Sequence, residues 1–354
     1  PEDYTLLIRR LHQLGMVCFK TSVKAVNGLF GIVKDRDSIR LIIDARPANG
    51  FFQEPDHVEL PTPDLLARLQ TTSADPIWVA KVDLDNFYHR LLIPDWMHEF
   101  FGLPPVLAQD VGLDSVFGFG TFIYPCCTTL PMGWSHSVRL AQSAHEHILD
   151  SRTPLTATDR ITVHSDLLLD RTRHFVYVDD LIMAGHDRDH VAELQVAYQA
   201  AVASIGLPAK HSKVIPPSST GVECVGLEVD GINHTVGASA ARLHRLLSDT
   251  ASLLRAESCS GYHLARLVGK WSWIILCNRP AFAVFNAVYR FIQVAKARVF
   301  RLWDSVRKEL QVVVSLAPLL YAHLDAPWFA KSICTDASST GLGVAAAYLP
   351  SDVQ

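Results

Sequence analysis

The chain has 354 residues, a formal net charge of −4, 49% hydrophobic residues and 19% charged residues. This balance excludes a disordered chain and a strongly basic nucleic-acid binder, so any contact with nucleic acid must use local charge. Seven cysteines without a C-x-x-C spacing argue against a disulfide framework or a zinc module. The start does not resemble a signal peptide, and no apolar run is long enough to span a membrane. We therefore expect two or more subdomains, an intracellular location (cytoplasm or nucleus), no membrane partner and a fragment of a longer protein.

The N-terminal part of the chain predicts a helix followed by a basic hairpin. Apolar residues at helical spacing within residues 1–20 predict the helix. Residues 28–33 and 38–47 predict two strands around a charged turn, and this hairpin carries Lys34 and Arg40. Charged hairpin tips are usually only solvated, but paired Lys and Arg also supply the donors that a triphosphate needs.

A strong apolar strand over residues 77–82 leads directly into Asp83. An acid at a strand end, where the chain turns, is well placed to hold a metal ion at the edge of a sheet. A short helix from Leu65 to Gln70 precedes this strand, and the Gly-, Pro- and Phe-rich residues 102–120 predict a loop excursion.

A Pro-Met-Gly turn within residues 130–137 introduces a helix that runs to Leu149. Gly133 allows a close backbone approach at the start of this helix. The His-Glu-His run at 145–147 cannot share one helix face, so we interpret it as helix surface. The adjacent cysteines 126–127 are predicted to be core thiols, and the polar residues 150–172 are predicted to form an irregular insertion.

Residues 175–183 place two adjacent acids, Asp179 and Asp180, between two apolar runs. The runs predict strands, and the acids are predicted to form the tip of a tight hairpin that projects into a cleft. Two like charges held close together in a partly buried place are unfavourable unless a cation neutralises them. Magnesium, bound by carboxylates and substrate phosphates, is suited to that task, whereas a solvated Asp-Asp turn is the simpler alternative.

The rest of the chain predicts a helix over residues 188–205, a strand over 223–229, helices over 242–254, 262–276 and 282–300, and a final strand-turn-strand over 332–346. His186 and His190 are spaced for a shared metal, but no further zinc ligand is apparent. Cations greatly outnumber acids between residues 290 and 308: Arg290, Lys296, Arg298, Arg301, Arg307 and Lys308 face only Asp304.

The order of these motifs, from about residue 20 to about 235, resembles that of reverse transcriptases. Tyr177-Val178-Asp179-Asp180 matches the family's Tyr-x-Asp-Asp box, and Asp83 matches its other metal-binding acid. The resemblance implies an α+β right-hand polymerase with fingers, palm and thumb, whose palm is a ferredoxin-like antiparallel sheet. Asp83 and Asp179 lie far apart in the sequence, so only a fold that sets their strands side by side can make them one site.

The resemblance also implies roles for particular residues. Two Mg²⁺ ions, or Mn²⁺, would be held by Asp83, Asp179, Asp180 and the carbonyl of Leu84. Lys213 would protonate pyrophosphate, with Lys210 as a rival. The incoming nucleotide would be bound by Lys34, Arg40, Tyr88, Met132, Gly133 and Gln142, and the primer grip would be formed by Val225, Gly226 and Leu227. The family often has glutamine where Met132 stands.

The resemblance assigns the chain to four parts. It implies fingers over residues 1–82, a palm over 83–235 with a finger excursion at about 95–125 and the insertion at about 150–172, and a helical thumb and connection over 236–330. Residues 331–354 resemble the start of a ribonuclease H domain, where Asp336 would be the first metal-binding acid. Because the other carboxylates of that domain are missing, we predict no ribonuclease H activity.

The implied function is that of an RNA-directed DNA polymerase from a retrotransposon polyprotein, which extends a primer with dNTPs on an RNA or DNA template. The alternatives are a catalytically inactive nucleic-acid-binding relative and an RNA-directed RNA polymerase. The aromatic Tyr88, at the position that would exclude a 2′ hydroxyl, and the lack of a Gly before Asp179 count against the RNA polymerase.

Overall fold

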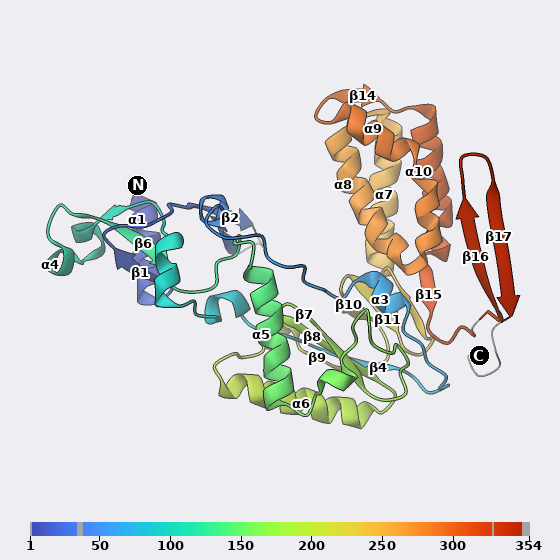
Figure 1. The fold of residues 1–354 in the computed structure, drawn as a ribbon, viewed down its shortest axis with the longest axis horizontal. Helices are drawn as coiled ribbons and strands as arrows, with labels where there is room; N and C mark the ends of the chain where they lie inside the picture. Colours follow the sequence, from blue (N-terminus) through green and yellow to red (C-terminus); the bar gives the residue numbers. More distant parts are fainter. Residues whose placement is uncertain (1, 34–37, 328, 349–354) are drawn as a thin grey trace.

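A four-stranded antiparallel sheet lies at the centre of the computed structural model, which describes residues 2–33, 38–327 and 329–348 (Figure 1). Its strand order is β7-β8-β4-β9, and the chain order β-α-β-β-α-β is that of a ferredoxin-like sheet. The elements are β4 (Trp78–Asp83), α5 (Ser137–Arg152), β7 (Arg173–Tyr177), β8 (Asp180–Gly185), α6 (Arg188–Ser204) and β9 (Ile215–Ser218).

The two faces of this sheet belong to different hydrophobic cores because successive side chains point to opposite sides. Val176 and Leu181 pack in the core that includes residues of α5 and α6, which cover one face. Phe175 and Ile182 pack in the other core, which also includes Leu65. Burial on both faces explains why the sequence around the acids is almost continuously apolar.

A second antiparallel sheet, in the order β10-β11-β12-β15, adjoins the central one. It comprises β10 (Val222–Cys224), β11 (Leu227–Asp230), β12 (Thr235–Gly237) and β15 (Tyr321–His323), and its core also includes residues of α3 (Pro63–Ala67). The single strand predicted over 223–229 is therefore wrong. The chain reverses at Val225 and Gly226, whose φ angles of 46° and 79° are those of a tight hairpin turn.

The N-terminal part contains the predicted helix and the predicted hairpin, and both predictions are confirmed. Lys34, at the hairpin turn, lies outside the described residues. The predicted loop excursion at 102–120 contains a short strand and a short helix. The elements are α1 (Glu2–Gln13), β1 (Val17–Lys20), β2 (Gly28–Val33), β3 (Ile39–Asp44), α2 (Arg46–Asn49), β5 (Val106–Leu107), α4 (Asp114–Phe117) and β6 (Phe122–Cys127), with β1, β6 and β5 forming one small sheet.

A helical bundle follows residue 238 and rises from the opposite end of the central sheet (Figure 1). It comprises α7 (Ala240–Ala256), β13 (Ser258–Ser260), α8 (Gly261–Ile275), α9 (Ala287–Ala295), β14 (Val299–Arg301) and α10 (Asp304–Leu316). The continuous helix predicted over 282–300 is wrong, because a 3₁₀ segment containing Pro280 precedes α9 and Lys296, with φ 48°, ends it. Glu309 of α10 accepts hydrogen bonds from the backbone N–H groups of residues 286–288 and fixes the start of α9.

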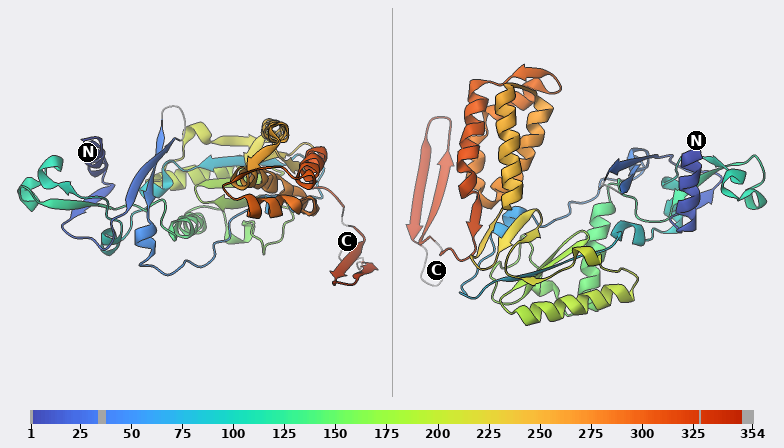
Figure 2. Two further views of the ribbon diagram at one scale, coloured as in Figure 1. Left: turned by 90° about the horizontal axis from the view of Figure 1, so that it is seen from above. Right: turned by 180° about the vertical axis from the view of Figure 1, so that it is seen from behind.

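The C-terminal hairpin of β16 (Lys331–Ala337) and β17 (Leu342–Tyr348) stands beside the bundle, and all of its residues are exposed (Figures 1 and 2). The predicted strand-turn-strand is confirmed, but Asp336, which was expected in the turn, lies inside the first strand and is paired with Gly343. Among the described residues, no helix combines the length and the apolar character needed to cross a membrane.

Candidate active site

The three acids singled out in the sequence meet at one edge of the central sheet. Asp83 ends β4, Asp180 begins β8, and these two residues are direct cross-strand partners. Directly opposed residues of antiparallel strands have Cα atoms about 4.5–5.5 Å apart. Asp179 occupies the turn just before β8, and its carbonyl accepts a hydrogen bond of 2.9 Å from the backbone N–H of Leu84. The strand ends thus bring together acids that are distant in the sequence.

The turn that contains Asp179 has strained backbone and is bound by two side chains of α5. Val178 has a φ of 55°, which is unfavourable for a β-branched residue. Its N–H donates to Oε1 of Gln142 at 2.8 Å, and its carbonyl is 2.8 Å from Nδ1 of His145. Because strained backbone persists only where its surroundings fix it, these two side chains position the turn that contains Asp179.

His145 is fully buried, so the interpretation of the His-Glu-His run as helix surface is wrong for this residue. Its second nitrogen, Nε2, lies 2.7 Å from the hydroxyl of Tyr198 on α6. Burial lowers the pKa of His145 to about 4, so the imidazole is neutral at physiological pH. His147, two residues further along the helix, is exposed as predicted.

Lysines neutralise two of the three acids. Lys213 forms an ion pair with Asp83, and Lys81 forms one of 2.8 Å with Asp180. Burial and the neighbouring charges of Asp180 and Asp83 raise the pKa of Asp179, while burial raises that of Asp180 despite Lys81. Asp180 Oδ1 is buried without a hydrogen-bond partner among the described residues. The three carboxylates therefore carry more negative charge than the two lysines neutralise, in a partly buried place where such charge is unfavourable.

A cavity of about 710 Å³ opens in front of the acids. Burial, and then the charge of Asp179, raise the pKa of Tyr88 to about 12. Lys213 also has a raised pKa, because the hydrogen bond and charge of Asp83 outweigh the opposing effect of burial. The cavity brings together eight of the predicted site residues or their rivals: Arg40, Asp83, Leu84, Tyr88, Met132, Asp179, Lys210 and Lys213.

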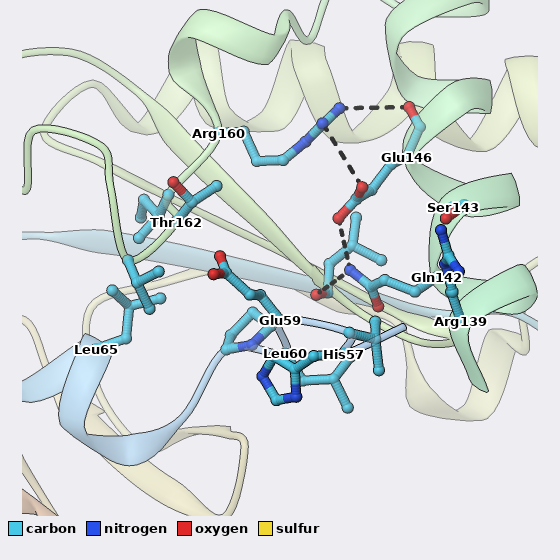
Figure 3. Close-up of a pocket in the computed structure, with 15 residues that line it drawn as sticks. His57, Glu59, Leu60, Leu65, Arg139, Gln142, Ser143, Glu146, Arg160 and Thr162 are labelled. Atoms are coloured by element: carbon cyan, nitrogen blue, oxygen red, sulfur yellow. Dashed lines mark hydrogen bonds and ion pairs between the residues drawn. The ribbon is translucent and has the colours of Figure 1, made fainter. Parts of the chain in front are cut away.

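Two predicted nucleotide-binding residues do not line this cavity. Gly133 has a φ of 123°, and a Cβ atom there would overlap the carbonyl oxygen of Ile43, so it serves the close approach of β3. Gln142 is 3% exposed and donates to Val176 O at 3.0 Å and to Glu146 Oε1 at 2.7 Å. It lines a separate cavity of about 270 Å³ beside α5 (Figure 3). Gln142 thus does not line the cavity that contains Arg40 and Tyr88, and its contact with nucleotide or template stays a prediction.

The predicted primer-grip residues form the β10–β11 turn next to the acids. Val225 and Gly226 share a second cavity, of about 570 Å³, with Tyr177, Asp180 and Lys213. Leu227 is buried at the start of β11. Two bundle residues that the sequence analysis did not identify hold this turn: Trp273 Nε1 donates to Val225 O at 2.8 Å, and Arg242 donates to Gly226 O.

The sequence analysis also missed Lys81. It precedes Asp83 by two positions, so both side chains lie on the same face of β4. A lysine inside the apolar stretch Ile77–Val82 was the available signal, because a charged residue is rarely placed in a covered strand without a partner.

His186, one of the two histidines whose spacing could suit a shared metal, makes other contacts. His186 lies 2.8 Å from Thr71 Oγ1 and 2.9 Å from Asp75 O. Within residues 2–33, 38–327 and 329–348, no three His, Cys, Asp or Glu side chains are gathered as a ready metal site. At the three acids, the carboxylates of Asp83 and Asp180 are turned toward lysines instead.

No protein-family model matches the sequence, and a comparison with curated proteins also gives no match. Solved structures do match in fold. The foamy viral protease-reverse transcriptase dRH in complex with ds DNA has a TM-score of 0.64 at 12% identity over 96% of this chain, and the protease-reverse transcriptase in complex with dsDNA has 0.61 at 14% over 97%. The same viral protein in complex with RNA/DNA hybrid has a TM-score of 0.57 at 13% identity over 96% of this chain.

This chain spans 51%, 62% and 42% of the lengths of those three chains, or about half. The protein thus has a mixed helix-and-sheet fold that is similar to viral reverse transcriptase structures.

Proposed function

We propose that the chain is an RNA-directed DNA polymerase of a retroelement, which adds dNTPs to a primer 3′ end on an RNA or DNA template. The observation that carries the proposal is the pairing of Asp83 with Asp180 beside the Asp179 turn, where Asp83 and Asp179 line a cavity that also contains Arg40 and Tyr88. In this proposal the N-terminal part acts as fingers, the central sheet as palm and the bundle as thumb.

The donor set of the three acids fits a hard divalent cation such as Mg²⁺. Every side-chain donor is a carboxylate oxygen, Asp180 Oδ1 has no partner among the described residues, and the pKa of Asp179 is raised by burial and like charge. Asp83, Asp179 and Asp180 would hold the ions, with the carbonyl of Leu84 and substrate phosphates completing the coordination. When bound, the ions would lower the pKa of the primer hydroxyl and stabilise charge on the triphosphate.

The chain's own residues perform the remaining tasks. Arg40 and Lys210 line the cavity and supply positive charge for the triphosphate. The ring of Tyr88 lies beside Asp179, where it would stack under the deoxyribose and leave no room for a 2′ hydroxyl. Lys213, which keeps its proton because Asp83 raises its pKa, would give that proton to the leaving pyrophosphate.

A second candidate is a catalytically inactive protein that binds nucleic acid through the same fold. One observation favours it: Lys81 and Lys213 already neutralise Asp180 and Asp83, so a cation would have to displace these ion pairs. The two candidates differ in their response to Mg²⁺, because binding to the folded state alone raises the melting temperature.

The deciding experiment is primer extension by the full chain on RNA and on DNA templates, with dNTPs and then rNTPs, in Mg²⁺ or Mn²⁺. We expect extension with dNTPs on both templates and none with the Asp179→Asn variant. A folded protein that binds primer–template but extends it under none of these conditions would establish the inactive alternative. Preferential use of rNTPs would instead identify an RNA polymerase.

A further inference from the structure

Two cysteines far from the acids in the fold lie directly opposite each other on neighbouring strands. Cys18 of β1 is the cross-strand partner of Cys126 of β6. Residues opposed in this way have Cα atoms about 4.5–5.5 Å apart, which is within the range that a disulfide bond can bridge. Cys126 is fully buried, whereas Cys18 is half-buried and so has access to solvent.

A histidine contacts the more exposed of the two sulfurs. His98 Nδ1 lies 3.3 Å from Cys18 Sγ. His98 is 7% exposed, and its other nitrogen, Nε2, is buried with no hydrogen-bond partner in the part of the chain that the structure describes, with Asp95 Oδ1 3.9 Å away. Lys20 follows Cys18 by two positions on the same strand face, and its Nζ donates to Asp95 O. The surroundings of Cys18 are therefore electropositive.

These neighbours favour the thiolate of Cys18. The interaction with the neighbouring Cys126 side chain, together with the charges of His98 and Lys20, outweighs burial and lowers the pKa of Cys18 to about 6. By contrast, burial raises the pKa of Cys127, Cys224 and Cys277 to about 12. The thiolate is the nucleophilic form of cysteine, so Cys18 is distinguished from the other buried thiols by its chemistry.

We propose that Cys18 and Cys126 form a peroxide-reactive dithiol site, with Cys18 as the attacking thiolate and Cys126 as the resolving thiol. The Cys18 sulfur attacks one oxygen of hydrogen peroxide, the O–O bond breaks, and the second oxygen leaves as hydroxide, which takes up the proton that Cys18 released. Cys126 then attacks the sulfur of the resulting sulfenic acid. An S–S bond forms, the S–O bond breaks, and the Cys126 proton leaves with that oxygen as water.

The balance is two thiols oxidised by two electrons and one peroxide reduced to two molecules of water. The new bond joins strands that are already paired, so it needs little rearrangement. Met16, two residues before Cys18, lines the cavity in front of the acids. Oxidation therefore links β1, next to the Met16 part of the cavity wall, covalently to β6. The proposal does not depend on nucleotide transfer in that cavity.

The test is peptide mapping of the full chain after treatment with a few equivalents of hydrogen peroxide and trapping of the remaining thiols by iodoacetamide. We expect a Cys18–Cys126 linked peptide to appear before the fully exposed Cys334 is oxidised. Cys126→Ser should instead accumulate a sulfenic acid at Cys18 that dimedone traps. His98→Gln should slow the reaction about tenfold, whereas Cys334→Ser should leave its rate unchanged.

The linked peptide is measured in the wild-type protein, so this result does not depend on how well the variants fold. Oxidation of Cys334 ahead of Cys18, or oxidation of Cys18 to sulfinic acid with no link to Cys126, would overturn the proposal. An equal rate for folded His98→Gln would remove the assigned role of the histidine and with it the activation of Cys18.

Discussion

The imidazole of His145 lies 2.8 Å from the carbonyl oxygen of Val178, the residue that immediately precedes Asp179. A carbonyl can only accept, so Nδ1 carries the proton and Nε2 accepts from the hydroxyl of Tyr198, 2.7 Å away. The chain Tyr198–His145–Val178 thus connects α6 through α5 to the turn that presents the acid. None of the three residues lines the cavity that contains Arg40 and Tyr88, so we expect them to act by positioning the turn.

Removing the tyrosine hydroxyl tests this arrangement with the least disturbance. Tyr198→Phe leaves His145 Nε2 buried without a donor, which should lower the free energy of unfolding by about 1–3 kcal/mol. Because the turn that carries Asp179 loosens, kcat for primer extension should fall while KM for dNTP stays nearly constant. Urea unfolding and steady-state extension measure the two effects.

The matched control is His147→Asn, on the exposed face of the same helix, which should change neither quantity. A purely structural role for Tyr198 would give a loss of stability with an unchanged kcat for the folded fraction. That result would contradict a positioning role.

Buried neutral histidines give the protein a specific acid sensitivity. Burial lowers the pKa of His145 to about 4 and that of His174 to about 3, against an ordinary value of 6.5. Below pH 6.5 the unfolded chain binds protons on these rings that the folded chain excludes, so stability falls as the pH falls toward 4. In His145→Asn, the stability lost between pH 7 and 4.5 should be smaller than in the wild type by about 2–3 kcal/mol.

The measurement is urea unfolding of both proteins at several pH values in that interval. The asparagine variant should be the less stable protein at pH 7, with the two curves converging toward acid pH. Curves that stay parallel from pH 7 to 4.5 would show that His145 is not buried in its neutral form.

Asp179 is expected to lower the stability of the fold while being required for activity. Its pKa is raised by burial and then by the charges of Asp180 and Asp83, so the ionised carboxylate destabilises the fold as the pH rises through and above that pKa. Asp179→Asn should therefore abolish extension and raise the free energy of unfolding at neutral pH by about 0.5–2 kcal/mol. Thermal unfolding without divalent ions, together with primer extension, tests both halves.

Mg²⁺ provides the complementary control. It should raise the melting temperature of the wild type and have a much smaller effect on Asp179→Asn, because the variant lacks one of the ligands. An equal Mg²⁺ effect on both proteins would place the bound ion elsewhere.

The three acids could be located from the sequence. The side chains that position their turn could not. Asp83, Asp179 and Asp180 follow or interrupt apolar strands, and this local pattern survives in the folded protein. The burial of His145 depends on Tyr198, which lies 53 residues further along the chain, so no local pattern could reveal it. A histidine followed by Glu146 and His147 on a helix looks the same in sequence whether it faces solvent or a core.

The hairpin turn at residues 225–226 also could not be predicted from the local sequence. A β-branched residue favours extended backbone, so Val225 argued for a continuous strand through this position. In the structure it adopts a positive φ because Trp273 and Arg242 bind the carbonyl groups of the turn. Tertiary contacts from the bundle thus override the local preference, and neither bundle residue could be paired with the turn from the sequence.

Sugar selection is predicted to reside in Tyr88. Its ring lines the cavity in front of Asp179, and a smaller side chain there would leave space for a 2′ hydroxyl. Tyr88→Val should raise the ratio of rNTP to dNTP incorporation about tenfold or more, equivalent to ~1.4 kcal/mol of lost discrimination. Tyr88→Phe keeps the ring and should keep the selectivity. Unchanged discrimination in an active Tyr88→Val enzyme would show that another residue excludes ribonucleotides.

The turn at Gly226 is predicted to position the primer through its contacts with the bundle. Gly226 has a φ of 79°, and a Cβ atom there would overlap the side chains of Arg242 and Trp273. Gly226→Ala should therefore weaken both hydrogen bonds to the turn, lower the affinity for primer–template several-fold and shorten the extension products. The KM for dNTP should change little, because Gly226 does not line the cavity that contains Arg40 and Tyr88.

Gly221→Ala is the matched control for this last prediction. Gly221 also has a positive φ, of 69°, but no atom lies within 4 Å of the position that a Cβ would occupy. Both variants thus carry the backbone cost of a left-handed alanine, about 1 kcal/mol, and only Gly226→Ala disturbs Arg242 and Trp273. Equal losses of primer–template affinity in the two variants would trace the effect to backbone strain rather than to the contacts between turn and bundle. A loss confined to Gly226→Ala, reproduced by Trp273→Phe, would establish that the bundle sets the position of the turn beside the acids.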